Sequence, residues 1–363
     1  MTARDFRRPS LFARLREWLT TGLRDRSRLR IVLPGLDRPA ECEASQPDKT
    51  GRPGEPGSEV WGGRAYQLNP VRWQLEPHVA EPLGDDQFAS LSEVMNPRRY
   101  DHPDWLTLHY ELESYSYDEH VFHKGDCHIV RKGWEWTHCI YGLQKLGAIR
   151  REARGLGVGA GREPVIFYLM DRISHVVATD LYGAAAWSKN VAREAEAAIT
   201  ADAQPFCKRP IRPERLAFKV ADGTDLPFDA ESFDIIWSLS SIEHFGGHDQ
   251  AAAAMREMGR VTAPGGIVAL ATEYLLLEEL RHPNFFNRAD LEASLIAPAR
   301  EMGLELADTP SFDTLPTPYL VDSVPVPQDE HRLRRHVVLN DGDVQWTSIM
   351  LFFQKPLEPA GPS

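Results

Sequence analysis

The glycine-rich segment from Gly155 to Met170 (GLGVGAGREPVIFYLM) constrains the fold of this chain more than any other feature. Gly157, Gly159 and Gly161 alternate with small residues, so the backbone there can turn sharply and approach a ligand closely. An apolar, helix-like run follows and begins with Pro164, a residue that suits the first turn of a helix. We therefore predict a turn that directs backbone N–H groups and a helix N-terminus at an anionic group.

An acidic residue ends the next apolar segment. HVVATD finishes at Asp180, nineteen residues past Gly161, where the second strand of a strand–helix–strand unit should end. A carboxylate at that place can accept two hydrogen bonds from a ribose diol, and a helix N-cap is the alternative role. The glycines alone do not exclude an NAD enzyme, because Gly155, Gly157 and Ala160 satisfy the pattern GxGxxA.

Strand-like and helix-like segments continue to alternate after Asp180. The segment FKVADGTDLPF places Asp222 and Gly223 behind a third strand, and FDIIWSL (233–239) has the apolar composition of a buried strand. A helix, a Pro-Gly-Gly turn and another strand follow between Met255 and Leu270. This alternation predicts an α/β fold, in which a doubly wound, largely parallel sheet carries helices on both faces.

From about Gly147 to Lys355 this order resembles the class I S-adenosylmethionine-dependent methyltransferases. GVGAG is similar to the family's glycine loop, TD at Asp180 to its ribose-binding acid, ADGTDLPF to its adenine-side segment and SFDIIWSLSSIEHF to its fourth strand. The resemblance implies a Rossmann-like, seven-stranded sheet with an antiparallel last strand. The C-terminal segment HVVLNDGDVQWTSIMLFFQKP agrees, because two strand patterns flank a DG turn and predict a hairpin. ADGTDLPF has no counterpart in the NAD fingerprint, which disfavours that alternative.

The resemblance also implies S-adenosylmethionine as cofactor and assigns site residues. By this likeness Gly157, Gly159 and Gly161 pass under the methionyl part of the cofactor and Asp180 holds the ribose. Asp222 and the Gly223 backbone meet the adenine amino edge, and Ser238, near the end of the fourth strand, faces the cofactor. The sequence departs from the family at Gly155, where an Asp or Glu is usual.

The methyl acceptor is expected to bind outside the glycine loop. We expect its contacts from a helical cap or substrate region at residues 86–146 and from an insert at residues 273–335 of the methyltransferase domain, residues 147–355. His244 is the candidate catalytic base, since imidazole has a suitable pKa. A small-molecule or glycan hydroxyl is the expected acceptor, and a catalytically inactive binding or scaffold protein is the alternative. Five side chains are candidates for an acceptor pocket or for ordinary packing: Trp134, Trp136, Tyr274, His282 and Phe285.

Residues 1–85 are expected to be a largely disordered extension, because residues 38–63 are rich in Pro, Gly and charge. Residues 4–30 are rich in Arg with helical apolar spacing, which predicts either a solvated tail or a basic amphipathic helix in weak peripheral contact with a membrane. No apolar run is long enough to span a bilayer, and we expect a cytoplasmic protein.

The charge and the metal-ligand spacing of the chain argue against two further functions. With a net charge of -12, broad nucleic-acid binding is disfavoured. The His- and Asp-rich stretch between Asp118 and His128 matches no metal-ligand spacing, so no metal is expected.

Overall fold

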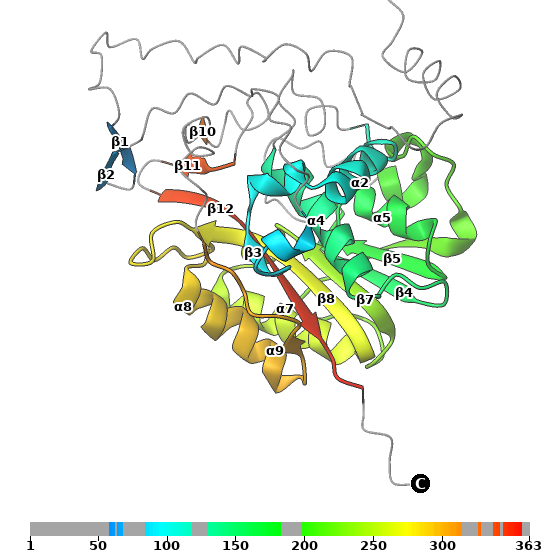
Figure 1. Cartoon of the computed structure of the whole chain (residues 1–363). Coiled ribbons are helices and arrows are strands. Elements are labelled where there is room, and N and C mark those ends of the chain that lie inside the picture. The colour runs from blue at the N-terminus through cyan, green and yellow to red at the C-terminus, as the bar shows by residue number, and fades with distance from the viewer. Residues whose placement is uncertain are drawn as a thin grey trace, which may run out of the picture. The chain divides into compact units, whose positions relative to one another are not determined.

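The computed structural model describes residues 58–61, 64–67, 84–117, 130–182, 198–313, 326–327, 337–341 and 344–357. The expected N-terminal extension therefore lies mostly outside the described residues, as does the stretch between Asp118 and His128. Within the described part, strands β1 (Ser58–Trp61) and β2 (Arg64–Gln67) pair with each other in an antiparallel ribbon. All other strands belong to one ten-stranded sheet (Figure 1).

Five strands form the parallel part of this sheet, in the spatial order β8-β7-β4-β5-β6. Their bounds are β4 Arg154–Val158, β5 His175–Asp180, β6 Leu216–Val220, β7 Phe233–Leu239 and β8 Thr262–Leu275. The predicted strands at 175–180 and 233–239 are thus confirmed. The strand β7 is buried on both faces, which explains why FDIIWSL is almost continuously apolar.

The antiparallel last strand is also confirmed. Strand β12 (Val344–Gln354) pairs antiparallel with β8 along most of its length, and β11 (Leu339–Asp341) forms the predicted hairpin with it. The outer edge of β12 is further covered by β3 (Glu93–Val94) and β9 (Glu305–Leu306), and β10 (Val326–Pro327) adds to β11. Three separate segments thereby pair with the exposed side of β12, so the sheet exceeds the seven strands that were expected.

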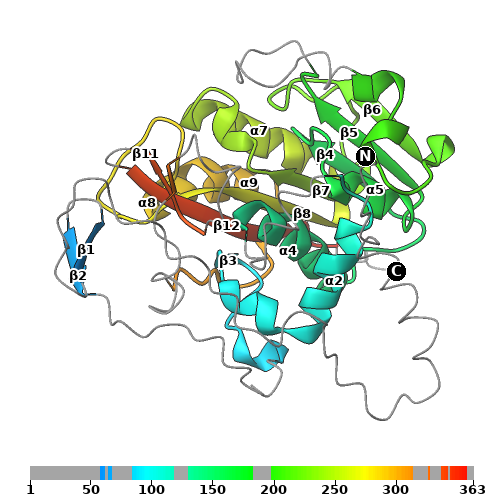
Figure 2. The ribbon, with the colours of Figure 1, turned by 90° about the horizontal axis from the view of Figure 1, so that it is seen from above.

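Helices cover both faces of the sheet, as Figures 1 and 2 show. The helices α2, α4 and α5 share one hydrophobic core with the sheet residues Ile235 and Trp237, whereas α7, α8 and α9 share a second core with Ile236 and Val268. Their bounds are α2 Pro103–Glu113, α4 Arg131–Lys145, α5 Pro164–Met170, α7 His248–Val261, α8 Arg288–Leu291 and α9 Ala297–Glu301. Alternate residues of β7 therefore face alternate cores.

Single helical turns complete the described secondary structure. They are the 3-10 turns Asp85–Gln87, Pro97–Asp101, Gln204–Phe206, Pro213–Arg215 and Ile242–His244, and a π turn at Glu292–Ile296 between α8 and α9. The side chain of Asn287 accepts the backbone N–H of Asp290, so Asn287 caps α8. No helix among the described residues is long and apolar enough to cross a membrane.

Most residues of α4 are buried, and the absence of a side chain at Gly142 allows the helix to pack closely against the sheet. A Cβ atom on Gly142 would lie 2.1 Å from Cζ of Phe352, a fully buried residue of β12. The phenyl ring of Phe352 thus occupies the space that a side chain on α4 would need. This close approach brings the N-terminal turn of α4 over the ends of the sheet strands, where the candidate site lies.

We predict that Gly142→Ala lowers the free energy of unfolding by about 1–3 kcal/mol, because the added methyl group overpacks a rigid core. In an exposed helix a Gly→Ala change stabilises by about 1 kcal/mol, so the sign of the change in unfolding free energy distinguishes a packed position from an exposed one. Denaturant unfolding of the wild type and of Gly142→Ala measures this change. In a Phe352→Leu background the penalty should shrink, and an unchanged penalty there would contradict the proposed clash.

Candidate functional site

The predicted glycine turn begins at the end of β4 and has the backbone that only glycine adopts freely. Gly159 has φ +65° and Gly161 has φ +51°. A Cβ atom on Gly159 would lie 2.6 Å from Cβ of Ser241, so a side chain there would clash. The hydroxyl of Ser241 donates to the carbonyl of Gly159 at 2.7 Å, and Thr179 Oγ1 donates to the carbonyl of Gly157 at 2.7 Å. Both neighbouring strands therefore hold the turn in place.

The turn lies where the strand order reverses. β4 pairs in parallel with β5 on one side and with β7 on the other. The chain proceeds outward from β4 through β5 to β6 and then returns to β7 and β8. In open α/β sheets, ligands bind outside the carboxyl ends of the strands at such a reversal, because the two connections leave in opposite directions. The position of the glycine turn thus marks the candidate site.

Asp180 lies beside the glycine turn, at the end of β5. Its Oδ2 accepts the backbone N–H of Gly161 at 2.9 Å, and its Oδ1 accepts the N–H of Leu181 at 2.6 Å. Partial burial raises the pKa of this carboxyl, while the backbone N–H groups of Leu181, Gly161 and Tyr182 oppose that shift. A carboxylate offers about four acceptor positions, so Asp180 fastens the turn and still has capacity for a hydroxyl donor.

Asp222 and Gly223 follow β6, on the far side of β5. Asp222 is exposed, and its Oδ1 accepts both the N–H and the hydroxyl of Thr224, at 2.9 and 2.7 Å. Gly223 is buried, and a Cβ atom on it would lie 2.5 Å from the ring of Phe245 and 3.0 Å from Val158. Close packing alone therefore requires glycine at position 223, whereas Asp222 keeps Oδ2 available for a donor.

Two serine hydroxyls, of Ser238 in β7 and of Ser240 just after it, are buried without a hydrogen-bond partner among the described residues. Ser238 is fully buried, and among the described residues its hydroxyl has no hydrogen-bond partner. The same holds for the hydroxyl of Ser240, which also has a left-handed backbone with φ +50°. A non-glycine residue in this region is strained, and such strain concentrates at functional sites. Ser240 lies one residue before Ser241, the side chain that holds the turn.

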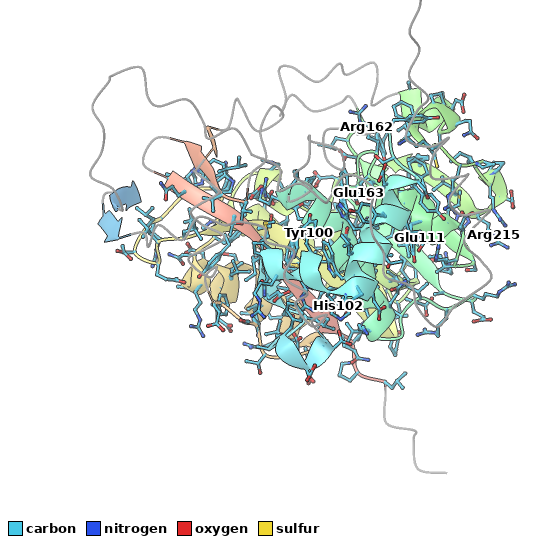
Figure 3. The ribbon with its side chains drawn as sticks, turned by 45° about the horizontal axis from the view of Figure 1, so that its top comes forward. Tyr100, His102, Glu111, Arg162, Glu163 and Arg215 are labelled. Atoms are coloured by element: carbon cyan, nitrogen blue, oxygen red, sulfur yellow. The ribbon has the colours of Figure 1, made fainter. Side chains whose placement is uncertain are left out.

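The departure at Gly155 has a physical explanation in Trp237. A Cβ atom on Gly155 would lie 2.8 Å from Ile173 and 3.3 Å from the indole of Trp237 on β7. The indole N–H of Trp237 donates to Oε1 of Glu163 at 2.5 Å. The buried carboxyl group near this turn therefore comes from position 163, eight residues after the family's usual position. Figure 3 labels Glu163 and its neighbour Arg162 in the turn before α5.

Glu163 differs chemically from an exposed carboxylate. Burial raises its pKa to about 8, although Lys132 and the indole N–H groups of Trp237 and Trp136 favour the charged form. At neutral pH the group is therefore mostly protonated. It acts as a neutral hydrogen-bonding link between β7 and the start of α5.

A buried charged cluster from α4 lies over the ends of β8 and β12. The Nη1 atom of Arg131 donates to Glu135 at 3.0 Å, to Glu273 at 2.5 Å and to the hydroxyl of Ser348 at 2.9 Å. Burial alone would raise the pKa of Glu135, but Lys132 and Arg131 outweigh it and hold that pKa at about 2. Burial raises the pKa of Glu273 to about 7, against the attraction of Arg131. The cluster therefore holds one firmly ionised and one readily protonated carboxyl group.

Glu243 and His244 form a short turn behind β7, next to this cluster. Glu243 is fully buried; its Oε2 accepts the hydroxyl of Thr272 at 2.9 Å, and its Oε1 has no hydrogen bond among the described residues. Burial raises its pKa to about 7. The His244 ring is 37% exposed and its Nε2 lies 3.9 Å from Glu243 Oε1. Burial lowers the pKa of His244, and the charge of Glu273 opposes that effect.

The aromatic candidates do not gather around one opening. Trp134 stacks on His138, Tyr274 packs against Phe312, and Phe285 stacks on His282 with 4.1 Å between ring centroids. Trp134, Trp136, Tyr274 and Phe285 are all buried. These contacts are those of ordinary core residues.

Sequence reasoning missed Arg131, Glu135, Glu163 and Glu273. Apart from the contacts of Glu135 with Arg131 and Lys132 within α4, their partners are distant in sequence. The available signal was the cost of placing charged residues inside otherwise apolar segments. Among the residues that the structure describes, no group of His, Cys, Asp or Glu side chains is arranged to hold a metal ion.

The raised pKa of Glu163 predicts a pH-dependent stability. The unfolded carboxyl ionises near its ordinary pKa, whereas the folded one stays protonated to about 8, so the folded state binds more protons between these values. The protonated Glu163 carboxyl contributes its full stabilisation below the pKa of the unfolded state, and this contribution declines as the pH rises to about 8. Glu163→Gln replaces the carboxyl with an amide that does not titrate. From pH 5 to 8, denaturant unfolding should show the wild type losing stability relative to Glu163→Gln, and parallel curves would contradict the assignment.

Comparisons with known proteins agree with this geometry. A family model described as "Methyltransferase domain" matches residues 156–270, which begin in β4 and end in β8. Methyltransferase GfsG of Streptomyces halstedii is 45% identical over 58 residues, which cover 16% of this chain and 20% of that protein. The 27-O-demethylrifamycin SV methyltransferase of Amycolatopsis mediterranei is 32% identical over 130 residues, 36% of this chain and 41% of that protein.

The chain thus matches less than half the length of these two curated relatives. Among solved structures, YcgJ of Bacillus subtilis has a TM-score of 0.42 and 17% identity, and the match covers 60% of this chain and 98% of that protein. Residues 156–270 of this chain thus match a methyltransferase domain. The strand order, with its antiparallel last strand, agrees with the class I methyltransferase fold that the sequence resembles.

Proposed function

We propose that this chain transfers a methyl group from S-adenosylmethionine to a hydroxyl group of a small molecule or glycan. The glycine turn at the strand reversal, flanked by Asp180 and Asp222, is the observation that supports S-adenosylmethionine as the cofactor. The residues fit such a cofactor: a Cβ atom on Gly161 would enter the open space beside Asp180, 3.8 Å from its Oδ2, and the buried Ser240 hydroxyl lacks a partner among the described residues. The acceptor class is an inference from the candidate base and from the relatives' names.

The binding residues have separate roles in this proposal. Asp180 accepts from the ribose hydroxyls with its remaining lone pairs, and Asp222 accepts from the adenine amino group through Oδ2. Gly157, Gly159 and Gly161 allow the backbone to pass beneath the methionyl part, and the Gly223 backbone lies beside the adenine. Ser238 stays a candidate contact only if its buried hydroxyl becomes accessible on binding. When bound, S-adenosylmethionine supplies an activated methyl group on a sulfonium.

The protein then mainly aligns the acceptor and excludes water, and orientation alone can lower a barrier by about 7–11 kcal/mol. His244 removes the proton from the acceptor hydroxyl. Burial keeps its pKa low, so the imidazole is neutral and ready to accept a proton at neutral pH. The charge of Glu273 favours the protonated ring that results. Its position beside Arg131 makes Glu273 a positioning residue in this scheme.

We predict that Asp180→Ala weakens S-adenosylhomocysteine binding about 10-fold to 100-fold, because a charge-assisted hydrogen bond contributes about 1.5–3 kcal/mol. Isothermal titration calorimetry measures the change. Asp229→Ala, at an exposed carboxylate of a nearby loop, serves as the control and should bind as the wild type does. Equal affinity of Asp180→Ala and the wild type would refute the assigned role of Asp180.

For His244→Gln we predict a kcat lower by about 100-fold or more with an unchanged dissociation constant for S-adenosylhomocysteine. The assay follows radioactive methyl transfer from S-adenosylmethionine to a panel of sugars and phenols. The wild-type rate should rise with pH through a value below about 6.5, the ordinary histidine pKa, because the base must be neutral. A variant with full activity on every accepted hydroxyl would exclude His244 as the base.

A further inference from the structure

The ammonium group of Lys132 lies at the strand reversal. Lys132 is in the first turn of α4, and its Nζ donates to the carbonyl of Leu239, the last residue of β7, at 3.1 Å. It also donates to Oε2 of Glu135 at 2.9 Å. Glu163, at the end of the glycine turn, is close enough to interact electrostatically with it. One cation therefore lies between the end of β7 and the end of the glycine turn.

This cation has capacity for another partner. An ammonium group carries three donors, and two of those of Lys132 are used by the contacts with Leu239 and Glu135. The side chain is 32% exposed, whereas its neighbour Arg131 is 9% exposed and binds three acceptors within the cluster. Lys132 is thus the member of this cluster that can reach a ligand.

The start of α4 also favours an anion. Helix N-termini are stabilised by acidic residues, yet the first turn of this 15-residue helix contains none and begins with Arg131 and Lys132. Its N-cap, Val130, provides no side-chain hydrogen bond. The positive end of the helix dipole and the Lys132 ammonium therefore act together. Glu135 offsets part of this charge and, through its bond to Lys132, holds the ammonium in position.

We propose that Lys132 binds the carboxylate at the methionyl end of the cofactor and thereby selects ligands that carry it. The inference rests on the proposed cofactor site and adds a recognition residue from outside the glycine turn and the strands. The ammonium donates to the carbonyl of Leu239, two residues before Ser241, whose hydroxyl donates to Gly159 of the glycine turn, so its third donor can serve a carboxylate bound at that turn. The other cation beside the turn, Arg162, is exposed and is the competing candidate.

Two ligands that differ only in the carboxylate test this role: S-adenosylhomocysteine carries it, and S-adenosyl-3-thiopropylamine is the same molecule without it. A third ligand, 5′-methylthioadenosine, lacks the whole amino-acid end and serves as the control. Isothermal titration calorimetry of each ligand into wild type, Lys132→Gln, Lys132→Arg and Arg162→Gln gives the affinity ratios. Lys132→Gln keeps an N–H donor for the Leu239 carbonyl, and unchanged affinity for 5′-methylthioadenosine shows that the adenosine site is still folded.

The wild type should bind S-adenosylhomocysteine about 10-fold to 100-fold more tightly than the thiopropylamine analogue, as a charge-assisted contact predicts. In Lys132→Gln this ratio should fall to within about threefold of one, and Lys132→Arg should largely restore it. If Lys132→Gln keeps the wild-type ratio of the two affinities, the proposal is overturned while the cofactor site stands. The same holds if Arg162→Gln loses this ratio instead. Folded wild type that binds none of the three ligands refutes the cofactor site itself, and with it the role of Lys132.

Discussion

The close approach of β4 and β7 is the constraint on which the rest of the structure depends. The two strands pair in parallel, and the indole of Trp237 packs over positions 155 and 157, where a Cβ atom would lie 3.3 and 2.6 Å from it. A side chain at either glycine would displace that indole and its hydrogen bond to Glu163. Trp237 thereby links the end of β4 to Glu163 at the start of α5.

A cluster of charged groups is buried beside this apolar core. Isolated buried charges are costly, and they persist where partners compensate them. Arg131 and Lys132 compensate Glu135, and the remaining carboxyls, Glu273 and Glu243, have pKa values raised to about 7. The cluster is therefore near neutral overall, and its protonation can change near physiological pH. Shifted pKa values of this kind occur at functional sites and also in structural ion-pair networks.

Local patterns in the sequence were sufficient for several strands of the sheet and for the residues next to the glycine turn, but not for the short strands β3, β9 and β10. Alternation of apolar segments gave β5, β7 and the C-terminal hairpin, and the spacing from Gly161 located Asp180 at the end of its strand. Local patterns could not find Glu163, because its partner Trp237 lies 74 residues away. Nor could they join Arg131 to Ser348 across 217 residues. Such contacts depend on the order of strands in space, which periodicity does not encode.

The central claim is that the cofactor occupies the strand reversal and reaches the first turn of α4. Hydrogen–deuterium exchange with and without S-adenosylhomocysteine tests it most directly. The account predicts ligand-dependent protection in residues 157–163, 180–182, 222–226 and 238–241 and at the start of α4. A shallow groove elsewhere, lined in part by Glu278, Arg288 and Phe312, is the internal reference. Protection confined to that groove, or absent from the glycine turn when the ligand is bound, would contradict the account.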